Sequence, residues 1–228
     1  MTTPRFDVDV VLFDLDGTLL DTIPDLHEAA RRMLEELGEP TRSLDEVTRF
    51  VGRGIPNLVE RCLTDGRAAC DGASLEAAVA VFRRHYAAVN GRSTRIYEGV
   101  ADTLGALQAQ GIRMACITNK AGAFTLPLLD HMGLAHFFGC VVSGDTLPVK
   151  KPDPAPLLHA CEALGVSPTR ALMVGDSAND ALAAQSAGIP VLLMTYGYSE
   201  GRAVDTIECD GLVSAFPGLL RLIGRASA

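Results

Sequence analysis

The sequence predicts an α/β fold, in which a doubly wound parallel sheet carries a small all-helical domain inserted after its first strand. Short apolar runs recur along the chain with helix-like segments between them, which is the pattern of βαβ units. Between the first two runs the pattern changes, and apolar residues recur at helical spacing instead. The 228 residues, 48% of them hydrophobic, suffice for one large domain with a modest insertion.

The apolar runs are the predicted strands of the core. They are short and rich in β-branched residues or Leu, as strands buried on both faces are. In chain order they cover 10–13, 112–117, 140–142, 171–174 and 191–194, with a weaker last one at 211–213 and a terminal helix around 215–223. A sheet of this kind is Rossmann-like, and its ligands bind outside the carboxyl ends of the strands.

Residues 22–94 break the alternation and predict an all-helical insertion. Three apolar stripes at helical spacing begin at Leu26, Ile55 and Leu75, and the first runs as far as Leu37. Thr22 followed by Asp25 is typical of a helix start. Antiparallel helical pairs can bury such stripes against each other. We therefore expect a core domain of residues 1–21 and 95–228, and a helical cap domain of residues 22–94 over the strand ends.

Composition and charge exclude several classes of partner. A formal net charge of −8 argues against nucleic acid and anionic membrane as partners. No segment approaches the roughly 20 apolar residues of a membrane span, and the N-terminal MTTPRFDVDV carries acids where a secretory signal is basic and then apolar. The six cysteines, Cys70 among them, form no CxxC pair, which favours reduced thiols over a zinc site. We expect a cytoplasmic monomer or homodimer.

The first predicted strand ends in carboxylates. In VVLFDLDGTLLDT, Asp14 and Asp16 are two residues apart, so both side chains point to one face. Carboxylates this close persist only where one is protonated or a cation is shared. Gly17 permits a tight turn, whose N–H groups can cradle an anion. A lone DxD is more often a turn with two solvated acids, and Asp21 is expected to be a helix-start acid.

Three further polar clusters follow later strands. Each has an ordinary explanation when taken singly: a helix cap, a solvated pair of lysines, and acids at a helix N-terminus. Because the carboxyl ends of parallel strands meet at one edge, the clusters together predict a single site for a phosphate and a metal ion. They are Thr118-Asn119, Lys150-Lys151-Pro152, and Gly175-Asp176-Ser177 with Asp180.

These motifs occur in a recognisable order: DLDGTL, a Thr at the end of the next strand, Lys-Pro, and GDSxxD. Together they resemble the haloacid dehalogenase-like superfamily, whose phosphatases use an aspartate nucleophile, and the resemblance spans nearly the whole chain. It implies that the helical insertion is a cap that closes over the site. It also implies that Asp14 attacks phosphorus to form an aspartyl-phosphate. Asp16 would protonate the leaving alcohol and then deprotonate the attacking water.

The same resemblance implies a cofactor and supporting roles. Mg²⁺ would be held by Asp14, the backbone carbonyl of Asp16, and Asp176. With Asp16 protonated, the remaining site acids are balanced by Mg²⁺ and one lysine, so a locally neutral site can accept a phosphate dianion. The implied supporting groups are Thr118 and Asn119 on the phosphate oxygens, Lys151 between Asp14 and the phosphoryl group, and Asp180 in an outer position that orients the metal's waters or Lys151.

Residues of the predicted cap narrow the resemblance from the superfamily to one of its subfamilies. FVGRGIPNLVERCL is similar to the cap loop of phosphoglycolate phosphatases, as are SGDTLPVKKPDPAPLL, GDSANDALAAQSAGIP and TYGYSEG elsewhere, while Ala121 departs from an expected proline. This implies a small-molecule phosphoester substrate, 2-phosphoglycolate, hydrolysed to glycolate and phosphate. Its carboxylate calls for a cation on the cap. Arg53 is the candidate, because arginine suits bidentate carboxylate binding; the alternative is an exposed surface arginine with no role at the site.

Three alternatives stay open. The same cap class serves phosphatases of sugar phosphates and other small phosphoesters. Mutases of the β-phosphoglucomutase type keep the aspartyl-phosphate but return the phosphate to a sugar. A phospho-acceptor signalling module also places acids, a Thr or Ser, a Lys and Mg²⁺ at strand ends. Receiver domains of that kind are about half this length and lack an acid two residues after the nucleophile.

Overall fold

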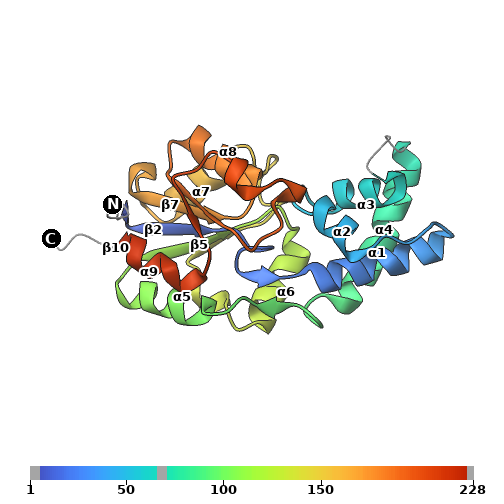
Figure 1. The fold of residues 1–228 in the computed structure, drawn as a ribbon, viewed down its shortest axis with the longest axis horizontal. Helices are drawn as coiled ribbons and strands as arrows, with labels where there is room; N and C mark the ends of the chain where they lie inside the picture. The colour runs from blue at the N-terminus through green and yellow to red at the C-terminus, as the bar shows by residue number, and fades with distance from the viewer. Residues whose placement is uncertain (1–5, 66–70, 225–228) are drawn as a thin grey trace.

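The structure of the protein, a computed structural model, describes residues 6–65 and 71–224. An α/β core occupies one end of the molecule, and a unit of packed helices occupies the other (Figure 1). Cys70 lies outside the described residues. Within those described ranges, no helix has both the length and the hydropathy needed to cross a membrane.

The core is built on a six-stranded sheet whose paired strands are all parallel, which confirms the predicted fold class. The strand order is β6-β5-β2-β7-β8-β9, so the chain winds outward from β2 in both directions. The crevice at such a reversal of strand order is where ligands bind in these folds. The strands are β2 (Val10–Phe13), β5 (Arg113–Ile117), β6 (Cys140–Val142), β7 (Ala171–Gly175), β8 (Val191–Met194) and β9 (Gly211–Val213).

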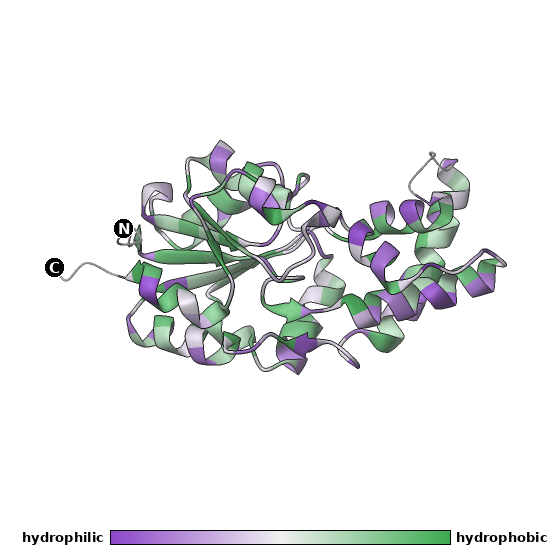
Figure 2. Ribbon diagram, in the orientation of Figure 1, coloured by the Kyte–Doolittle hydropathy of each residue, from purple (hydrophilic) through white to green (hydrophobic). Residues whose placement is uncertain are grey.

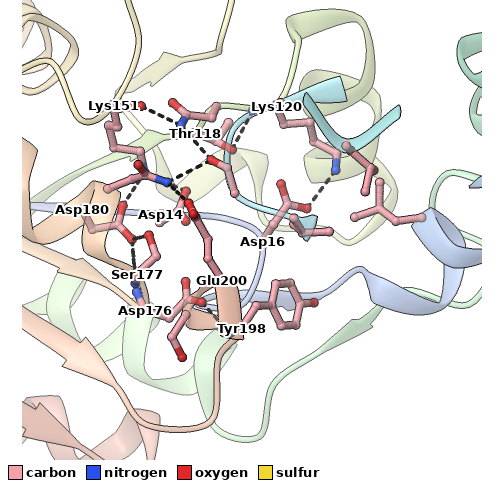
Figure 3. Close-up of a pocket in the computed structure, with 18 of the residues that line it drawn as sticks. Asp14, Asp16, Thr118, Lys120, Lys151, Asp176, Ser177, Asp180, Tyr198 and Glu200 are labelled. Carbon is pink, nitrogen blue, oxygen red and sulfur yellow. Dashed lines mark hydrogen bonds and ion pairs between the residues drawn. The ribbon is translucent and has the colours of Figure 1, made fainter. Parts of the chain in front are cut away.

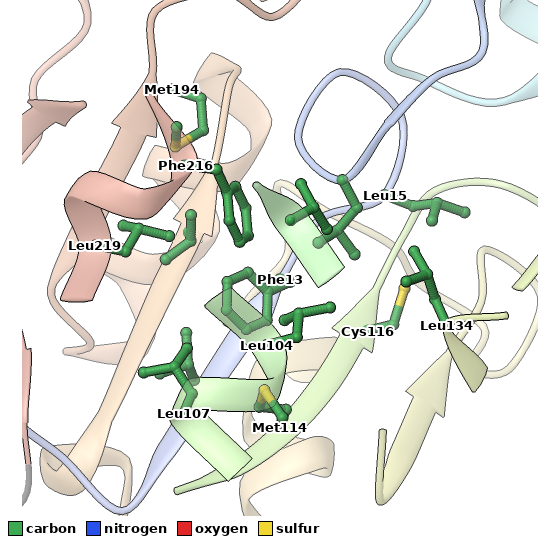
Figure 4. Close-up of a cluster of buried hydrophobic side chains, with 14 of the residues drawn as sticks. Phe13, Leu15, Leu104, Leu107, Met114, Cys116, Leu134, Met194, Phe216 and Leu219 are labelled. Atoms are coloured by element: carbon green, nitrogen blue, oxygen red, sulfur yellow. The ribbon is translucent and has the colours of Figure 1, made fainter. Parts of the chain in front are cut away.

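Helices cover both faces of this sheet, which explains why β2, β7 and β8 are buried at every position and carry no polar side chain (Figure 2). In β2, Val11 and Phe13 face one layer of helices, and Val10 and Leu12 face the other. Phe13 packs against Phe216 at a centroid distance of 5.6 Å, within the cluster of Figure 4. The first layer holds α5 (Val100–Ala109), α6 (Gly122–His131) and α9 (Leu219–Leu222), and the second α7 (Ala155–Ala163) and α8 (Ala178–Ala187).

The predicted terminal helix over 215–223 is too long. The chain forms a 3₁₀ turn at Phe216–Gly218 before the short α9. Beyond it, β10 (Ile223–Gly224) pairs in parallel with β1 (Phe6–Asp7) at the other end of the chain. This pairing joins residues far apart in sequence, so a local apolar pattern cannot indicate it.

The helical unit has an apolar core of its own. It consists of α1 (Ile23–Leu37), α2 (Leu44–Phe50), α3 (Ile55–Thr64) and α4 (Gly72–Val89), with α1 and α3 packed on α4. Met33, Phe82 and Tyr86 are fully buried between them. Leu37, predicted for this face, is 39% exposed because α1 ends there, with Gly38 in the left-handed conformation at φ 73°.

Two adjacent segments join this unit to the core. In them β3 (Leu20–Asp21) pairs antiparallel with β4 (Arg95–Ile96). Asp25 lies in the first turn of α1, as expected, but its carboxylate is buried and accepts hydrogen bonds from the backbone N–H groups of Gly91, Ser93 and Thr94 at 2.9–3.0 Å. The two connections are thereby held together as one structural element beside the strand ends.

Candidate active site

A pocket lies between the carboxyl ends of the strands and the helical unit. The turn after β2, the end of β5, the loop before α7 and the start of α8 form its floor, and α1, α3 and α4 form the opposite wall. The predicted polar clusters meet here, as expected for strand ends at a switch point. Figure 3 shows Lys151 between Asp14 and Asp180, with Lys120 reaching Asp16 from the other side.

Lys151 is buried among acceptors. Its Nζ lies 2.8 Å from Asp14 Oδ1 and 2.6 Å from Asp180 Oδ1, and it also donates to the carbonyl of Ile117. Burial opposes a charge on this amine, but the two carboxylates outweigh it and raise the Lys151 pKa above its usual range. Burial raises the pKa of Asp14, Lys151 opposes the rise, and the charges of Asp180 and Asp176 add to it. The buried lysine therefore balances only part of the acidic charge.

Asp176 is positioned by two neighbouring segments, the turn after β2 and the loop after β8. Its Oδ1 accepts from the Thr18 hydroxyl at 2.9 Å and its Oδ2 from the Tyr198 backbone N–H at 2.7 Å. Burial, followed by the charge of Asp180, raises the Asp176 pKa to about 7. Gly17 and Gly197 make this approach possible, because a Cβ on either would lie within 2.4 Å of an Asp176 atom, and Gly17 also has φ +92°.

Asp180 holds two parts of the site at once. Its Oδ2 accepts from the backbone N–H groups of Asp176 and Ser177 and from the Ser177 hydroxyl, at 2.8–3.2 Å. Its Oδ1 faces Lys151. The side chain is fully buried, and it both caps α8 and fixes the lysine that contacts Asp14.

The chemistry of the acidic cluster suits a divalent cation. Carboxylate oxygens of Asp14, Asp176 and Asp180 all lie within 4.8 Å of one another. Lys151 neutralises one of these three charges, so a doubly charged ion would balance the remainder. Oxygen donors are those that Mg²⁺ prefers. Asp180 Oδ2 already accepts three hydrogen bonds and its Oδ1 faces Lys151, whereas each Asp176 oxygen accepts one and, among the described residues, Asp14 is contacted only at Oδ1, so Asp14 and Asp176 retain lone pairs to coordinate.

Asp16 is held on one oxygen. Its Oδ1 accepts from the Thr22 hydroxyl at 2.6 Å and from Lys120 Nζ at 2.8 Å, while no such contact engages Oδ2 among the described residues. Burial works against a charge on Lys120, but Asp16 and Tyr86 outweigh it and raise the lysine's pKa. The sequence reasoning missed Lys120, although it directly follows Thr118-Asn119 at the same strand end. Tyr86, expected among core or rim residues, is buried and lines the pocket.

Thr118 and Asn119 both line the pocket, but their side chains are engaged differently. The Thr118 hydroxyl accepts from the Lys120 backbone N–H at 3.2 Å and retains its own hydrogen to donate. Both amide hydrogens of Asn119 are used, on the carbonyls of Gly52 at 2.9 Å and Lys151 at 2.8 Å. A phosphate contact from Asn119 would therefore have to come from its backbone N–H.

Arg53 lies beside the pocket, because its two chain neighbours, Gly52 and Gly54, line the pocket. Its side chain is 54% exposed, and its Nε lies 3.1 Å from Glu200 Oε2. Glu200, which follows β8 and was not expected at the site, also accepts from Asn179. In this structure the guanidinium is thus paired with a carboxylate of the protein.

Comparison with known proteins agrees with this geometry. Residues 8–188 match the family described as haloacid dehalogenase-like hydrolase. The chain belongs to that family. This hydrolase is 48% identical to a phosphoglycolate phosphatase of Nitrosospira multiformis, over 96% of its own chain and 97% of the relative's. It is 45% identical to a phosphoglycolate phosphatase of Thiobacillus denitrificans with the same coverage. Among solved structures, a "predicted phosphoglycolate phosphatase" from Haemophilus somnus 129pt matches with a TM-score of 0.87 and 32% identity, covering 94% of this chain and 97% of that one.

Proposed function

We propose that this hydrolase is a Mg²⁺-dependent phosphomonoester hydrolase whose substrate is 2-phosphoglycolate, which it cleaves to glycolate and phosphate. The substrate is supported by the two phosphoglycolate phosphatases that are 48% and 45% identical to this chain over almost their full lengths. The observation that carries the chemistry is the buried contact of Asp14 with Lys151 beside two further carboxylates. It supports a mechanism in which Asp14 is the nucleophile, Lys151 faces the phosphoryl group and the carboxylates supply oxygen ligands.

The first half of the reaction follows from which oxygens are free. Lys151 holds Asp14 Oδ1, so Oδ2 attacks phosphorus and the bond from phosphorus to the ester oxygen breaks. Thr22 and Lys120 hold Asp16 Oδ1, so Oδ2 delivers its proton to the departing alcohol oxygen. The products of this half are the free alcohol and an aspartyl-phosphate on Asp14.

The second half returns the enzyme to its starting state. Asp16, now ionised, takes a proton from water as the water oxygen attacks phosphorus. The Asp14–phosphorus bond breaks, phosphate leaves, and Asp16 is again protonated. The Thr118 hydroxyl donates to a phosphoryl oxygen through both halves, and the nearby charge of Lys151, whose hydrogens are used on protein acceptors, stabilises the phosphoryl group. Asp14, Asp176 and the Asp16 carbonyl would hold Mg²⁺, which when bound withdraws charge from those oxygens.

We further propose the division into a core of residues 1–21 and 95–228 and a cap of residues 22–94. The separate apolar cluster of the helices and the paired connections β3 and β4 support it. A cap joined through one ribbon can close over the pocket as a unit and exclude water from the first half-reaction.

Phosphate release tests the proposal. A panel of 2-phosphoglycolate, sugar phosphates and p-nitrophenyl phosphate would be assayed with Mg²⁺ and with chelator, and Asp14→Asn would serve as the shape-matched control. We expect a preference for 2-phosphoglycolate that both chelator and the substitution abolish. Preference for a sugar phosphate would overturn the substrate but not the chemistry. Absence of turnover on every ester would overturn the hydrolase mechanism, and interconversion of sugar phosphates would identify a mutase.

A further inference from the structure

Lys120 is a buried cation to which the proposed steps assign one role, that of holding Asp16 Oδ1. Within the described part of the chain, the pocket is lined by two cationic side chains, Lys120 and Lys151. Lys151 has an acceptor for each of its three hydrogens. Lys120 is only 7% exposed, and within the described ranges its Nζ meets hydrogen-bond geometry with one acceptor, Asp16 Oδ1. It therefore has hydrogens left for a ligand, in a place where water is largely excluded.

Tyr86 supplies a second unused donor at the same place. The ring lies under Lys120, whose Nζ is 5.0 Å from the ring centroid. The side chain is fully buried, and among the described residues no group meets hydrogen-bond geometry with its hydroxyl. A buried tyrosine hydroxyl normally has such a partner, so an orphan one beside a pocket indicates that a ligand completes it. A cation and a hydroxyl donor together suit a carboxylate.

We propose that Lys120 and Tyr86 form the subsite that binds a carboxylate carried by the alcohol half of the substrate. This inference rests on the proposed function, because the position of the alcohol follows from the role of Asp16. The alcohol oxygen lies at Asp16 when it receives the proton, and Lys120 touches Asp16 at 2.8 Å. Only an anion close to the ester oxygen can reach the lysine. A carboxylate on the adjacent carbon meets this condition.

The remaining wall of the pocket favours the same class of substrate. The side chains contributed by the helical unit are apolar apart from Tyr86, and Leu26, Ile55 and Leu58 are among them. Sugar hydroxyls against this wall would lose their bonds to water without replacement. Arg53, the cation expected from the sequence for this role, faces Glu200 instead. The subsite thus selects a short acid rather than a polyhydroxyl group.

Kinetics on a matched pair of substrates tests the subsite. Ethyl phosphate resembles 2-phosphoglycolate but lacks the carboxylate. For Lys120→Met, which keeps the length of the side chain without its charge, we expect kcat/KM on 2-phosphoglycolate to fall about 100-fold more than on ethyl phosphate. Tyr86→Phe, which preserves the packing, should lower the same ratio by about 10-fold. Lys150→Met is the control, because it removes an ammonium that contacts the Arg53 carbonyl and should leave the ratio unchanged.

Binding separates this inference from the proposed function. 3-Phosphonopropionate, a non-hydrolysable mimic with a carboxylate, would be titrated calorimetrically against propylphosphonate, which has none. The wild type should prefer the carboxylate compound, and Lys120→Met should remove that preference. Equal loss of both substrates and both phosphonates in Lys120→Met and Tyr86→Phe would overturn the subsite. If the wild type turns over no ester, the proposed function fails, and a carboxylate preference lost in Lys120→Met would still support the subsite.

Discussion

Asp176 should make the metal-free protein less stable as pH rises through neutrality. Its pKa is 3.8 in the reference state and about 7 in the fold, because the carboxyl is buried beside Asp180. Between these values the folded state keeps a proton that the unfolded state has released. The folded state therefore gains stability at low pH, and that gain is lost as pH rises toward about 7. Asp14, whose pKa is also raised, acts in the same direction.

The size of the effect follows from the shift. Each pH unit in the window changes the free energy of unfolding by about 1.4 kcal/mol, so Asp176 alone should remove about 2 kcal/mol between about pH 5.5 and pH 8. For a chain of this length, that corresponds to a fall in Tm of roughly 4–8 °C. Saturating Mg²⁺ should cancel the slope, since its ligands are ionised carboxylates. At a hundredfold excess over Kd, the ion should add about 2.7 kcal/mol.

Urea denaturation in chelator, at several pH values across that window, measures this slope. Asp176→Asn keeps the shape of the side chain and cannot titrate, so the difference between wild type and variant isolates one carboxyl from the rest of the protein. Glu28, whose pKa is lowered by its bonds to Arg31, changes charge well below this window. The reasoning would be refuted if the difference in free energy of unfolding between wild type and Asp176→Asn did not change with pH, or if the wild type became relatively more stable as pH rises.

Three other substitutions probe close contacts in and near the site. Lys151→Met leaves buried carboxylates without their cation, so phosphate release should slow by about 10³-fold and urea denaturation should show a loss of about 3–5 kcal/mol. Asp25→Ala removes the acceptor of three backbone N–H groups, so the free energy of unfolding should fall by about 3–5 kcal/mol. A fall of less than about 1 kcal/mol would contradict the buried contact. Gly197→Ala would place a Cβ 2.2 Å from Asp176 Cβ, so calorimetry should show Mg²⁺ affinity weakened by about 10-fold or more.

Much of the core was predictable because its physics is local. A strand covered on both faces is apolar at every position, and β2 and β8 are fully buried along their lengths. The meeting of Asp14, Thr118, Lys151 and Asp176 followed from a topological rule, since the carboxyl ends of parallel strands share an edge. The order of the motifs then identified the family that the comparisons show.

The contacts that the sequence did not reveal are those between distant segments. Asp25 has the spacing of a helix-start acid, yet its carboxylate joins the two connections between the helical unit and the core. Lys120 follows a predicted cluster, but only the fold shows that it turns toward Asp16 and packs on Tyr86 from α4. The pairing of β1 with β10 is likewise a product of the assembled core.

The loop at 51–54, which contains both glycines of VGRG, joins the helical unit to the core through its backbone. The Gly52 carbonyl accepts from the side-chain amides of Asn119 and Asn179, and the Arg53 carbonyl accepts from Lys150. These contacts reach the loop through its backbone, with Gly52 at φ +136°, where a Cβ would also meet Glu200. Asn119 adjoins Thr118 in the proposed phosphate site, so the segment proposed to hold the phosphate also holds the loop. A substrate that orders this segment would thereby stabilise the contact between the helical unit and the core.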